Sequence, residues 1–129
     1  MDHIAPFNFA SPATWARILV ALVWIVFGLG FKLLRALPRH ERIVARILGE
    51  RVAPLLTRGI GLGETLLGLW MLSGIHLPWC ALFQTVIIIT MNAIELRLAR
   101  DLLLSPRAML AANTLLLTLA WYAALAQPS

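Results

Sequence analysis

Residues 58–70 have the sequence RGIGLGETLLGLW, in which a single glutamate, Glu64, interrupts an apolar and glycine-rich run. The surrounding apolar stretch, residues 55–75, is close to the roughly 20 residues with which an α-helix crosses a bilayer. A charged side chain facing lipid near the bilayer centre costs at least about 2.5 to 3.5 kcal/mol. Glu64 is therefore expected to face other helices, and its partners determine how the rest of the chain is arranged around it.

The whole chain has the composition of an integral membrane protein. Of its 129 residues, 60% are hydrophobic and only 13% are charged, and its mean hydropathy is +0.84. The net charge of +5 does not indicate a nucleic-acid partner, because the basic residues lie between apolar runs, as they do at the ends of membrane helices. A single cysteine, Cys80, excludes an internal disulfide and a CxxC redox pair. The lipid bilayer is the expected partner.

Four apolar stretches predict four membrane spans in a single domain, residues 1–129. Because lipid offers backbone amides no hydrogen-bond partner, each span is expected to be an α-helix, even where it contains the β-branched segment TVIIIT at residues 85–90. Prolines are expected at or just outside the span boundaries, where a fixed φ and a missing N–H are tolerated. The predicted spans are residues 13–37, 55–75, 77–99 and 106–126.

The connection between the first two spans is predicted to be a short amphipathic helix in the membrane interface. Its sequence, RHERIVARILGER at residues 39–51, places apolar side chains on one face and charged side chains on the other. An ordinary cytoplasmic connector with charged flanks is the alternative. The predicted fold class is thus all-α, an integral membrane four-helix bundle with a short interfacial helix. The apolar face of that helix consists of Ile43, Val44, Ile47 and Leu48.

The distribution of basic residues predicts the orientation of the bundle. Of the 11 Lys and Arg residues, all but Arg17 fall around the two connections that share one side. By the positive-inside rule these connections are cytoplasmic, which makes the chain a multi-pass protein of the cell membrane with both termini outside. Trp24 is expected to lie deeper than the other aromatic anchors. The residues expected at the outer interface are Trp15, Trp70, Trp79, Trp121 and Tyr122.

Each predicted span carries a polar residue in the cytoplasmic half of the membrane. Glu64 follows Arg58 by six residues, or about 9 Å at the helical rise, which is too deep for its side chain to reach water easily. These polar residues are expected to face one another inside the bundle, where Lys32 and Glu64 form an ion pair. The candidate ligand-binding or proton-relay residues are Lys32, Glu64, Asn92, Glu95 and Asn113.

A structural role is the alternative for most of these candidates. Lys32 lies near enough to the interface to extend its amine towards water. Glu95 is expected to pair with an arginine near one of the connections, and asparagines often join membrane helices through hydrogen bonds.

Small residues predict close helix contacts near the expected ion pair. Gly61 and Gly68 lie on the same helical face as Glu64, and Gly28 provides room for a neighbour beside Lys32. A GxxxG motif, residues 59–63, lies on an adjoining face and is a further site for tight packing.

Several short patterns are spread over most of the chain, from Arg17 to about Leu117. They comprise Ala16-Arg17-Ile18-Leu19, Trp24-Ile25, Gly28, Lys32, Gly63-Glu64, Gly68, Asn92, Pro106 and Asn113. Together they resemble the DoxX-like group of small four-helix membrane proteins. Some members of that group are described as membrane subunits of quinone-reducing oxidoreductases, including those of thiosulfate oxidation, and others are linked to oxidative-stress defence. The resemblance implies a redox setting and no particular reaction.

No catalytic residue, metal site or intrinsic cofactor is expected in this chain. Its three histidines lie in terminal or connecting segments, where they cannot ligate a haem within the bilayer. The glycines of RGIGLGE lie in an apolar span and do not follow a strand, which argues against a dinucleotide site. A redox role would therefore require a bound quinone or a redox partner, with the candidate residues bonding carbonyl oxygens or relaying protons.

Three functions stay open. The chain is a non-catalytic or quinone-site-forming subunit of a membrane redox system, or a pathway for an ion or small solute. A pathway would require a homo-oligomer, since four helices leave little lumen. In the third interpretation the chain is a structural or assembly subunit whose paired polar residues join its helices.

Overall fold

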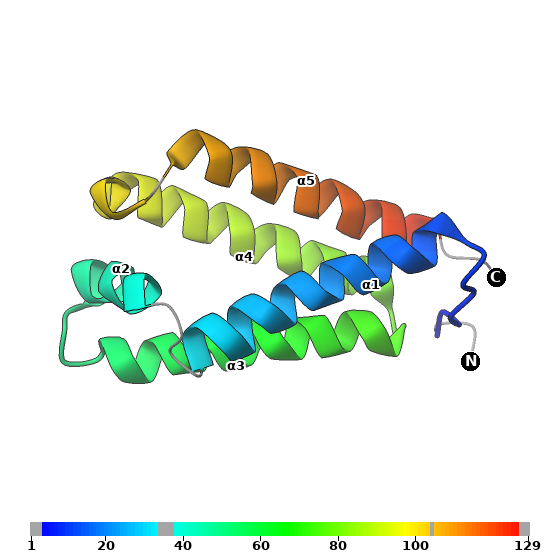
Figure 1. The fold of residues 1–129 in the computed structure, drawn as a ribbon, viewed down its shortest axis with the longest axis horizontal. Coiled ribbons are helices and arrows are strands. Elements are labelled where there is room, and N and C mark those ends of the chain that lie inside the picture. The colour runs from blue at the N-terminus through cyan, green and yellow to red at the C-terminus, as the bar shows by residue number, and fades with distance from the viewer. Residues whose placement is uncertain (1–3, 34–37, 104, 127–129) are drawn as a thin grey trace.

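A computed structural model describes residues 4–33, 38–103 and 105–126 (Figure 1). The described residues are almost entirely helical, which confirms the all-α class. Outside the helices, Ile4 and Ile75 form an isolated antiparallel bridge. The elements are α1 (Pro12–Ile25), the π-helix η1 (Val26–Leu33), α2 (Pro38–Leu48), α3 (Ala53–Ser73), α4 (Leu77–Leu98), the 3₁₀-helix η2 (Arg100–Leu102) and α5 (Pro106–Leu125).

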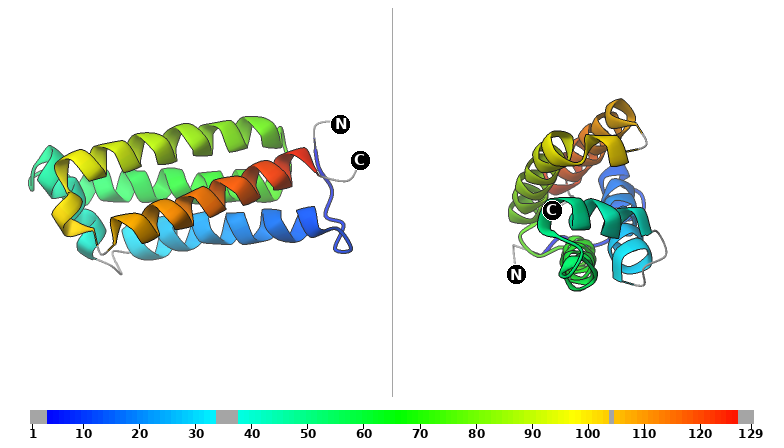
Figure 2. Two further views of the ribbon diagram at one scale, coloured as in Figure 1. Left: turned by 90° about the horizontal axis from the view of Figure 1, so that it is seen from above. Right: turned by 90° about the vertical axis from the view of Figure 1, so that its left-hand side faces the viewer.

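Four long helical rods lie side by side, and one short helix crosses their end. The rods are α1 with η1, α3, α4 and α5, and successive rods run in opposite directions (Figures 1 and 2). At one end, which we call the α2 end, α2 packs against α3, η1 and α4. The start of α1 and the end of α5 share the opposite end, which we call the N-terminal end (Figure 1). The connection between the first and second spans and the one between the third and fourth were predicted to share one side. Both lie at the α2 end (Figure 1), which confirms that prediction.

Three of the described helices are long and apolar enough to cross a membrane. They are Pro12–Gly30, Leu77–Leu98 and Pro106–Leu125, and they make the chain a multi-pass membrane protein. The second predicted span, residues 55–75, is present as the 21-residue helix α3 but is not among the three. Its polar and glycine content makes it less hydrophobic than the others. The last four residues of the first predicted span, 34–37, lie outside the described part of the chain.

Local sequence signals account for the helix boundaries. Proline occupies one of the first two positions of α1, α3, α4 and α5, as predicted. Ser11 and Ser105 cap α1 and α5 by accepting hydrogen bonds from backbone amides of the first turn. The end of α3 is set by Gly74, whose φ of 75° lies in the left-handed region. A Cβ on Gly74 would also lie only 2.4 Å from the carbonyl oxygen of Ala5.

Glycines let the first rod approach α3 closely, as the sequence predicts. A Cβ added to Gly28 would lie 2.5 Å from the carbonyl oxygen of Gly61, and one on Gly68 would lie 2.8 Å from that of Ala21. Neither position can hold a side chain without moving a helix backbone. The predicted GxxxG motif at residues 59–63 behaves differently, because Cβ atoms on its two glycines would meet open space. That motif is not used for packing within the described bundle.

Candidate functional site

The expected ion pair forms between the first rod and α3. Lys32 on η1 donates a hydrogen bond through Nζ to Oε1 of Glu64 on α3. Both side chains are largely enclosed, with 12% of Lys32 and 5% of Glu64 exposed. The close helix approach at Gly28, one helical turn from Lys32, brings the two backbones near enough for this contact. The contact occurs within the π-helical segment, a rare form that is frequent at functional sites.

The second oxygen of Glu64 is buried and has no hydrogen-bond partner among the described residues. Buried carboxylate oxygens are normally satisfied, because an unsatisfied polar atom costs about 1 to 3 kcal/mol. The hydroxyl of neighbouring Thr65 does not donate to this oxygen, because it donates to the carbonyl oxygen of Gly61 at 2.8 Å. Among the described residues nothing occupies this oxygen of Glu64, so it is placed to accept a hydrogen bond from a ligand or water.

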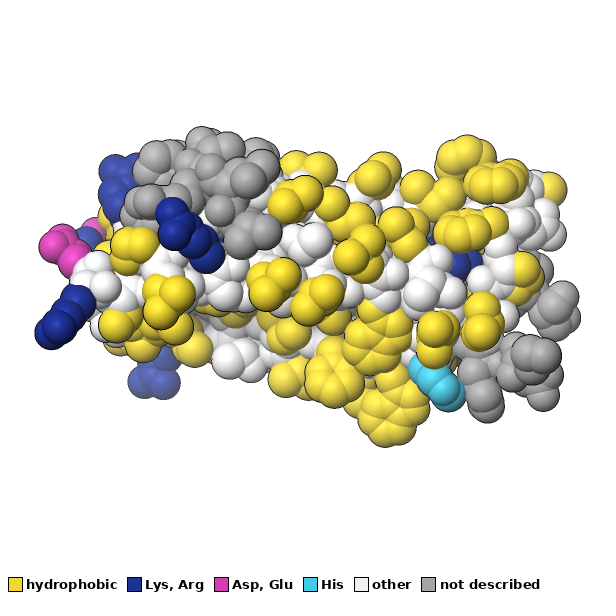
Figure 3. Space-filling view, turned by 90° about the horizontal axis from the view of Figure 1, so that it is seen from below, with side chains coloured by type: hydrophobic (Ala, Val, Ile, Leu, Met, Phe, Trp, Pro, Cys, Tyr) yellow, Lys and Arg dark blue, Asp and Glu magenta, His cyan; other side chains and the backbone are white. Residues whose placement is uncertain are grey.

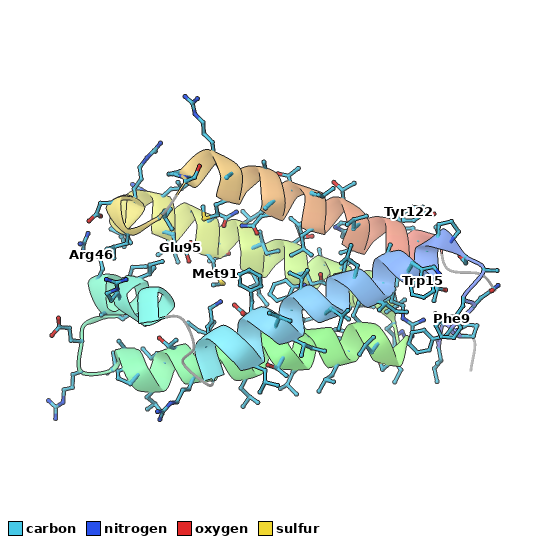
Figure 4. The ribbon with its side chains drawn as sticks, viewed as in Figure 1. Phe9, Trp15, Arg46, Met91, Glu95 and Tyr122 are labelled. Carbon is cyan, nitrogen blue, oxygen red and sulfur yellow. The ribbon has the colours of Figure 1, made fainter. Side chains whose placement is uncertain are left out.

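The two asparagine candidates pair with each other on the other two rods. Asn113 of α5 donates through Nδ2 to Oδ1 of Asn92 of α4 at 2.9 Å. The polar residues predicted to converge are therefore arranged as two pairs, one between η1 and α3 and one between α4 and α5. Glu95 is half-buried and, with Met91, lies on the side of α4 that faces α2 and η1 (Figure 4).

Helix α2 covers the bundle at the end nearest the ion pair (Figure 2). Its Ile43 is buried, in agreement with the predicted apolar face, whereas Leu48 is 57% exposed. Arg46 donates two hydrogen bonds to the carboxylate of Asp101 in η2, at 2.6 and 2.9 Å. This bidentate hydrogen bonding lowers the pKa of Asp101 below its ordinary value. The sequence indicated charged connections but did not identify this link between them.

Arg17 is a buried charge whose structural role the sequence did not predict. It is fully buried, and its guanidinium bonds the backbone at the end of α3, with Nε donating to Met71 O at 2.8 Å and Nη2 to Leu72 O at 2.6 Å. Nη1 donates to Ala5 O at 3.0 Å, and Phe7 lies with its ring centroid 4.0 Å from Cζ. Arg17 thus caps α3 and holds the N-terminal segment over it. The sequence signal for this buried role was the presence of a charged residue inside an apolar span.

Gln84 is a second buried residue that the sequence did not single out. It is fully buried on α4 and accepts a hydrogen bond from Trp24 Nε1 at 2.8 Å through Oε1. Its Nε2 donates to the sulfur atoms of Cys80 at 3.3 Å and Met71 at 3.5 Å. Trp24, which was expected to lie deeper than the other aromatic anchors, is buried inside the bundle, and an amide in an apolar span was the signal for its partner.

The described residues contain no group of three His, Cys, Asp or Glu side chains placed to hold a metal ion. Comparison with known families gives a match to the model of the DoxX-like family over residues 21–121. The chain belongs to the DoxX-like family. No curated protein and no solved structure matches it.

The DoxX-like match covers one end of the bundle more completely than the other. It includes the Lys32–Glu64 pair, Glu95 and the Asn92–Asn113 pair, which are all the candidate residues. Arg17 and the segment that it holds fall before the matched region. The family assignment therefore indicates a small membrane protein. It does not assign a reaction to the polar residues.

Proposed function

We propose that α3 crosses the membrane with the other three rods, as a four-helix bundle of the cell membrane with both termini outside. At 1.5 Å per residue its 21 residues extend about 31 Å, enough for the hydrocarbon core. Of its two charged residues, Arg58 is exposed near the start of the helix, where its long side chain can reach the interface, and the deeper Glu64 is buried and paired, which removes the cost of a lipid-facing carboxylate. Exposed apolar side chains run along the bundle while most basic ones gather at the α2 end (Figure 3). That end is cytoplasmic, with α2 in the interface.

Cysteine labelling in intact cells tests this orientation. In a Cys80→Ala background, Glu50→Cys places a thiol in the exposed connection before α3, and Ser73→Cys places one at its opposite, exposed end. A membrane-impermeant thiol reagent should label Ser73→Cys in intact cells and Glu50→Cys only after permeabilisation. The opposite pattern would reverse the assigned sides, and labelling of both in intact cells would reject the crossing of α3.

The proposed activity of the chain is to form a quinone site, without a redox centre of its own, in a membrane redox system. The observation that carries the proposal is the free Oε2 of Glu64, buried beside a lysine in the membrane. A purely structural ion pair gains stability by satisfying both oxygens of its carboxylate, whereas a site for a ligand leaves one available. Quinol hydroxyls donate hydrogen bonds and quinone carbonyls accept them, so an acid–base pair suits both forms.

Each residue of the pair has a distinct role in this proposal. Oε2 of Glu64 would accept a hydrogen bond from a quinol hydroxyl and take up one of the two protons that a quinol loses on oxidation, while Nζ of Lys32 would donate to a quinone carbonyl. The second proton would pass with the electrons to the partner enzyme. The quinone supplies the electron-carrying chemistry when bound, and the electrons pass to or from a partner enzyme. The alternatives have less support, because a solute pathway needs an oligomer and a structural pair does not explain the free oxygen.

Binding of a quinone analogue to the purified protein in lipid nanodiscs tests the site. Glu64→Gln keeps the shape of the side chain but replaces the carboxylate, and should weaken binding by about tenfold or more, the effect of losing a charged hydrogen bond. Glu50→Gln, at an exposed position, is the matched control and should bind like the wild type. Equal affinity in all three proteins, or no binding by the wild type, would reject the quinone site.

A further inference from the structure

A second buried polar atom lies on α3 in the direction of the cytoplasmic end. Thr57 is only 1% exposed, and its Oγ1 has no hydrogen-bond partner among the described residues. The same condition holds for Glu64 Oε2, and both residues face the inside of the bundle. Two unsatisfied buried atoms on one helix are unusual, because most such atoms have a protein or water partner.

Thr57 also differs from four of the six other threonines of the long helices. Thr65, Thr85, Thr114 and Thr118 each donate to the carbonyl oxygen four residues earlier, at 2.7 to 2.8 Å. This bond is the usual way for a threonine to satisfy its hydroxyl within a membrane helix. Oγ1 of Thr57 does not make it. The hydroxyl is thus available to a group that is not part of the helix.

Thr57 and Glu64 lie on one face of α3, separated by about two turns. Their seven-residue spacing places them about 10.5 Å apart along the helix axis, with buried Gly61 between them. The elements that pack on α3 are α1, η1, α2 and α4, and η1 approaches it next to Gly61. The distance is too long for a direct hydrogen bond, and Gly61 adds no side chain to the space between the two residues.

We propose that a short chain of water molecules connects Thr57 Oγ1 to Glu64 Oε2 and carries protons between the cytoplasmic end and the ion pair. Buried water occupies sites that offer it otherwise unsatisfied polar partners, and the two free atoms provide such partners at each end. Lys32 on η1 is the charged neighbour at the inner end, and Glu95 lies on the side of α4 that faces the same region (Figure 4). Thr57 is a positioning residue here, and Glu64 is the proton acceptor.

The path rests on the proposed function, because it supplies or removes the proton that a quinone site exchanges at Glu64. A carboxylate oxygen has two lone pairs, so Oε2 can accept a hydrogen bond from a quinol hydroxyl and one from water. The path nevertheless makes a separate prediction, since it concerns the rate at which Glu64 gains a proton when no quinone is present.

Infrared spectroscopy after a pH jump measures that rate in the full-length protein in lipid nanodiscs. The carboxyl band of Glu64 is assigned by its loss in Glu64→Gln. Thr57→Val, which has nearly the same shape but no hydroxyl, should slow the appearance of this band by about tenfold, the effect of one lost hydrogen bond on a barrier. Thr57→Ser should retain the wild-type rate. The matched control is Thr114→Val on the exposed surface of α5.

The outcomes separate this path from the quinone site. A Thr57→Val rate equal to that of the wild type, in a protein with an unchanged thermal unfolding midpoint, overturns the path even if the quinone analogue binds. If Thr57→Val is too unstable to measure, a Thr57→Ser rate lower than that of Thr114→Val overturns it instead. Failure of analogue binding rejects the quinone site and leaves the rate comparison intact.

Discussion

The N-terminal end and the middle of the bundle each bury a charged side chain, but they satisfy it differently. At the N-terminal end, Arg17 is 0% exposed and directs Nε, Nη1 and Nη2 to four backbone carbonyls at 2.6 to 3.3 Å. Midway along α3, Glu64 is 5% exposed, bonds Lys32 through one oxygen and leaves the other without a described partner. Burial alone therefore does not distinguish a structural charge from one available for chemistry.

The hydrogen-bond partners of each side chain distinguish the structural charge, Arg17, from the charge available for chemistry, Glu64. The carbonyls that Arg17 bonds belong to the end of a helix and to an irregular segment, where backbone acceptors have no helical partner. These bonds stabilise the fold and leave the arginine no spare role. Glu64 bonds one cation, Lys32, and its second oxygen has no partner among the described residues. An unsatisfied buried oxygen lowers the stability of the fold, but it can accept a hydrogen bond from a ligand. The following predictions test this difference between the surroundings of Arg17 and of Glu64, from the largest expected effect to the smallest.

Replacing Arg17 should destabilise the protein most. Arg17→Met removes four hydrogen bonds at about 1 kcal/mol each, so the free energy of unfolding should fall by roughly 4 kcal/mol. Titration of the detergent-solubilised protein with a denaturing detergent measures this change. Arg107→Met, at an exposed position, is the control and should have little effect. Similar losses in the two variants would show that the N-terminal end does not depend on Arg17.

Removing one member of the Lys32–Glu64 pair should have the next largest effect. Glu64→Gln or Lys32→Met should each lower the free energy of unfolding by about 2 kcal/mol, in the range of a charge-assisted hydrogen bond. The double variant should recover part of the loss, because neither charge is then left alone. Additive losses in the same titration would argue against the pair. A double variant that is stable but does not bind the quinone analogue would sharpen the contrast with Arg17.

Glycine substitutions test the close packing that positions the pair. Gly28→Ala should destabilise the bundle by roughly 1 to 2 kcal/mol, because its Cβ would lie 2.5 Å from the carbonyl oxygen of Gly61 and the helices would have to separate. Gly59→Ala is matched in chemistry but faces open space, so its unfolding midpoint should be unchanged or slightly higher. Equal effects of the two changes would contradict the observed approach.

The link between α2 and η2 should produce the smallest effect and a pH dependence. The pKa of Asp101 is lowered in the fold by the hydrogen bond from Arg46, so the link stabilises the protein above the ordinary pKa of aspartate. Its contribution is lost as the pH falls through the lowered value. The unfolding midpoint of Asp101→Asn should therefore lie slightly below that of the wild type at pH 7. The difference should disappear in strong acid, and a difference that persists there would exclude the link as its cause.

Features that depend on neighbours along the chain were predictable. Apolar length and the boundary prolines located the long helices, and three- and four-residue spacing placed Gly61, Glu64 and Gly68 on one face. The Lys32–Glu64 pair was also predictable, because in lipid a buried charge has few alternatives to an opposite charge on a neighbouring helix. Hydrogen bonds of Asn92 and Asn113 between helices were expected for the same reason, but the pairing of these two residues with each other was not predicted.

Features that depend on the meeting of distant segments were not predictable. Nothing in the residues around Arg17 indicates that the end of α3, 54 residues away, will offer it carbonyl oxygens. The choice of Gln84 as the partner of Trp24, across 60 residues, and of Asp101 as the partner of Arg46 likewise depends on how the rods pack. Backbone carbonyls are present at every residue, and so carry no sequence signal that selects one as an acceptor.

The sequence by itself determined that this chain is helical, that it lies in a membrane, and that Lys32 and Glu64 must compensate each other there. These properties follow from hydropathy and helical periodicity, which a single chain displays locally. Only the tertiary structure decided that Arg17 bonds four carbonyls while Glu64 Oε2 and Thr57 Oγ1 have no partner in the described parts of the chain. The physical reason is that satisfaction of a buried polar atom depends on distances and directions to groups on other helices, which no local pattern encodes.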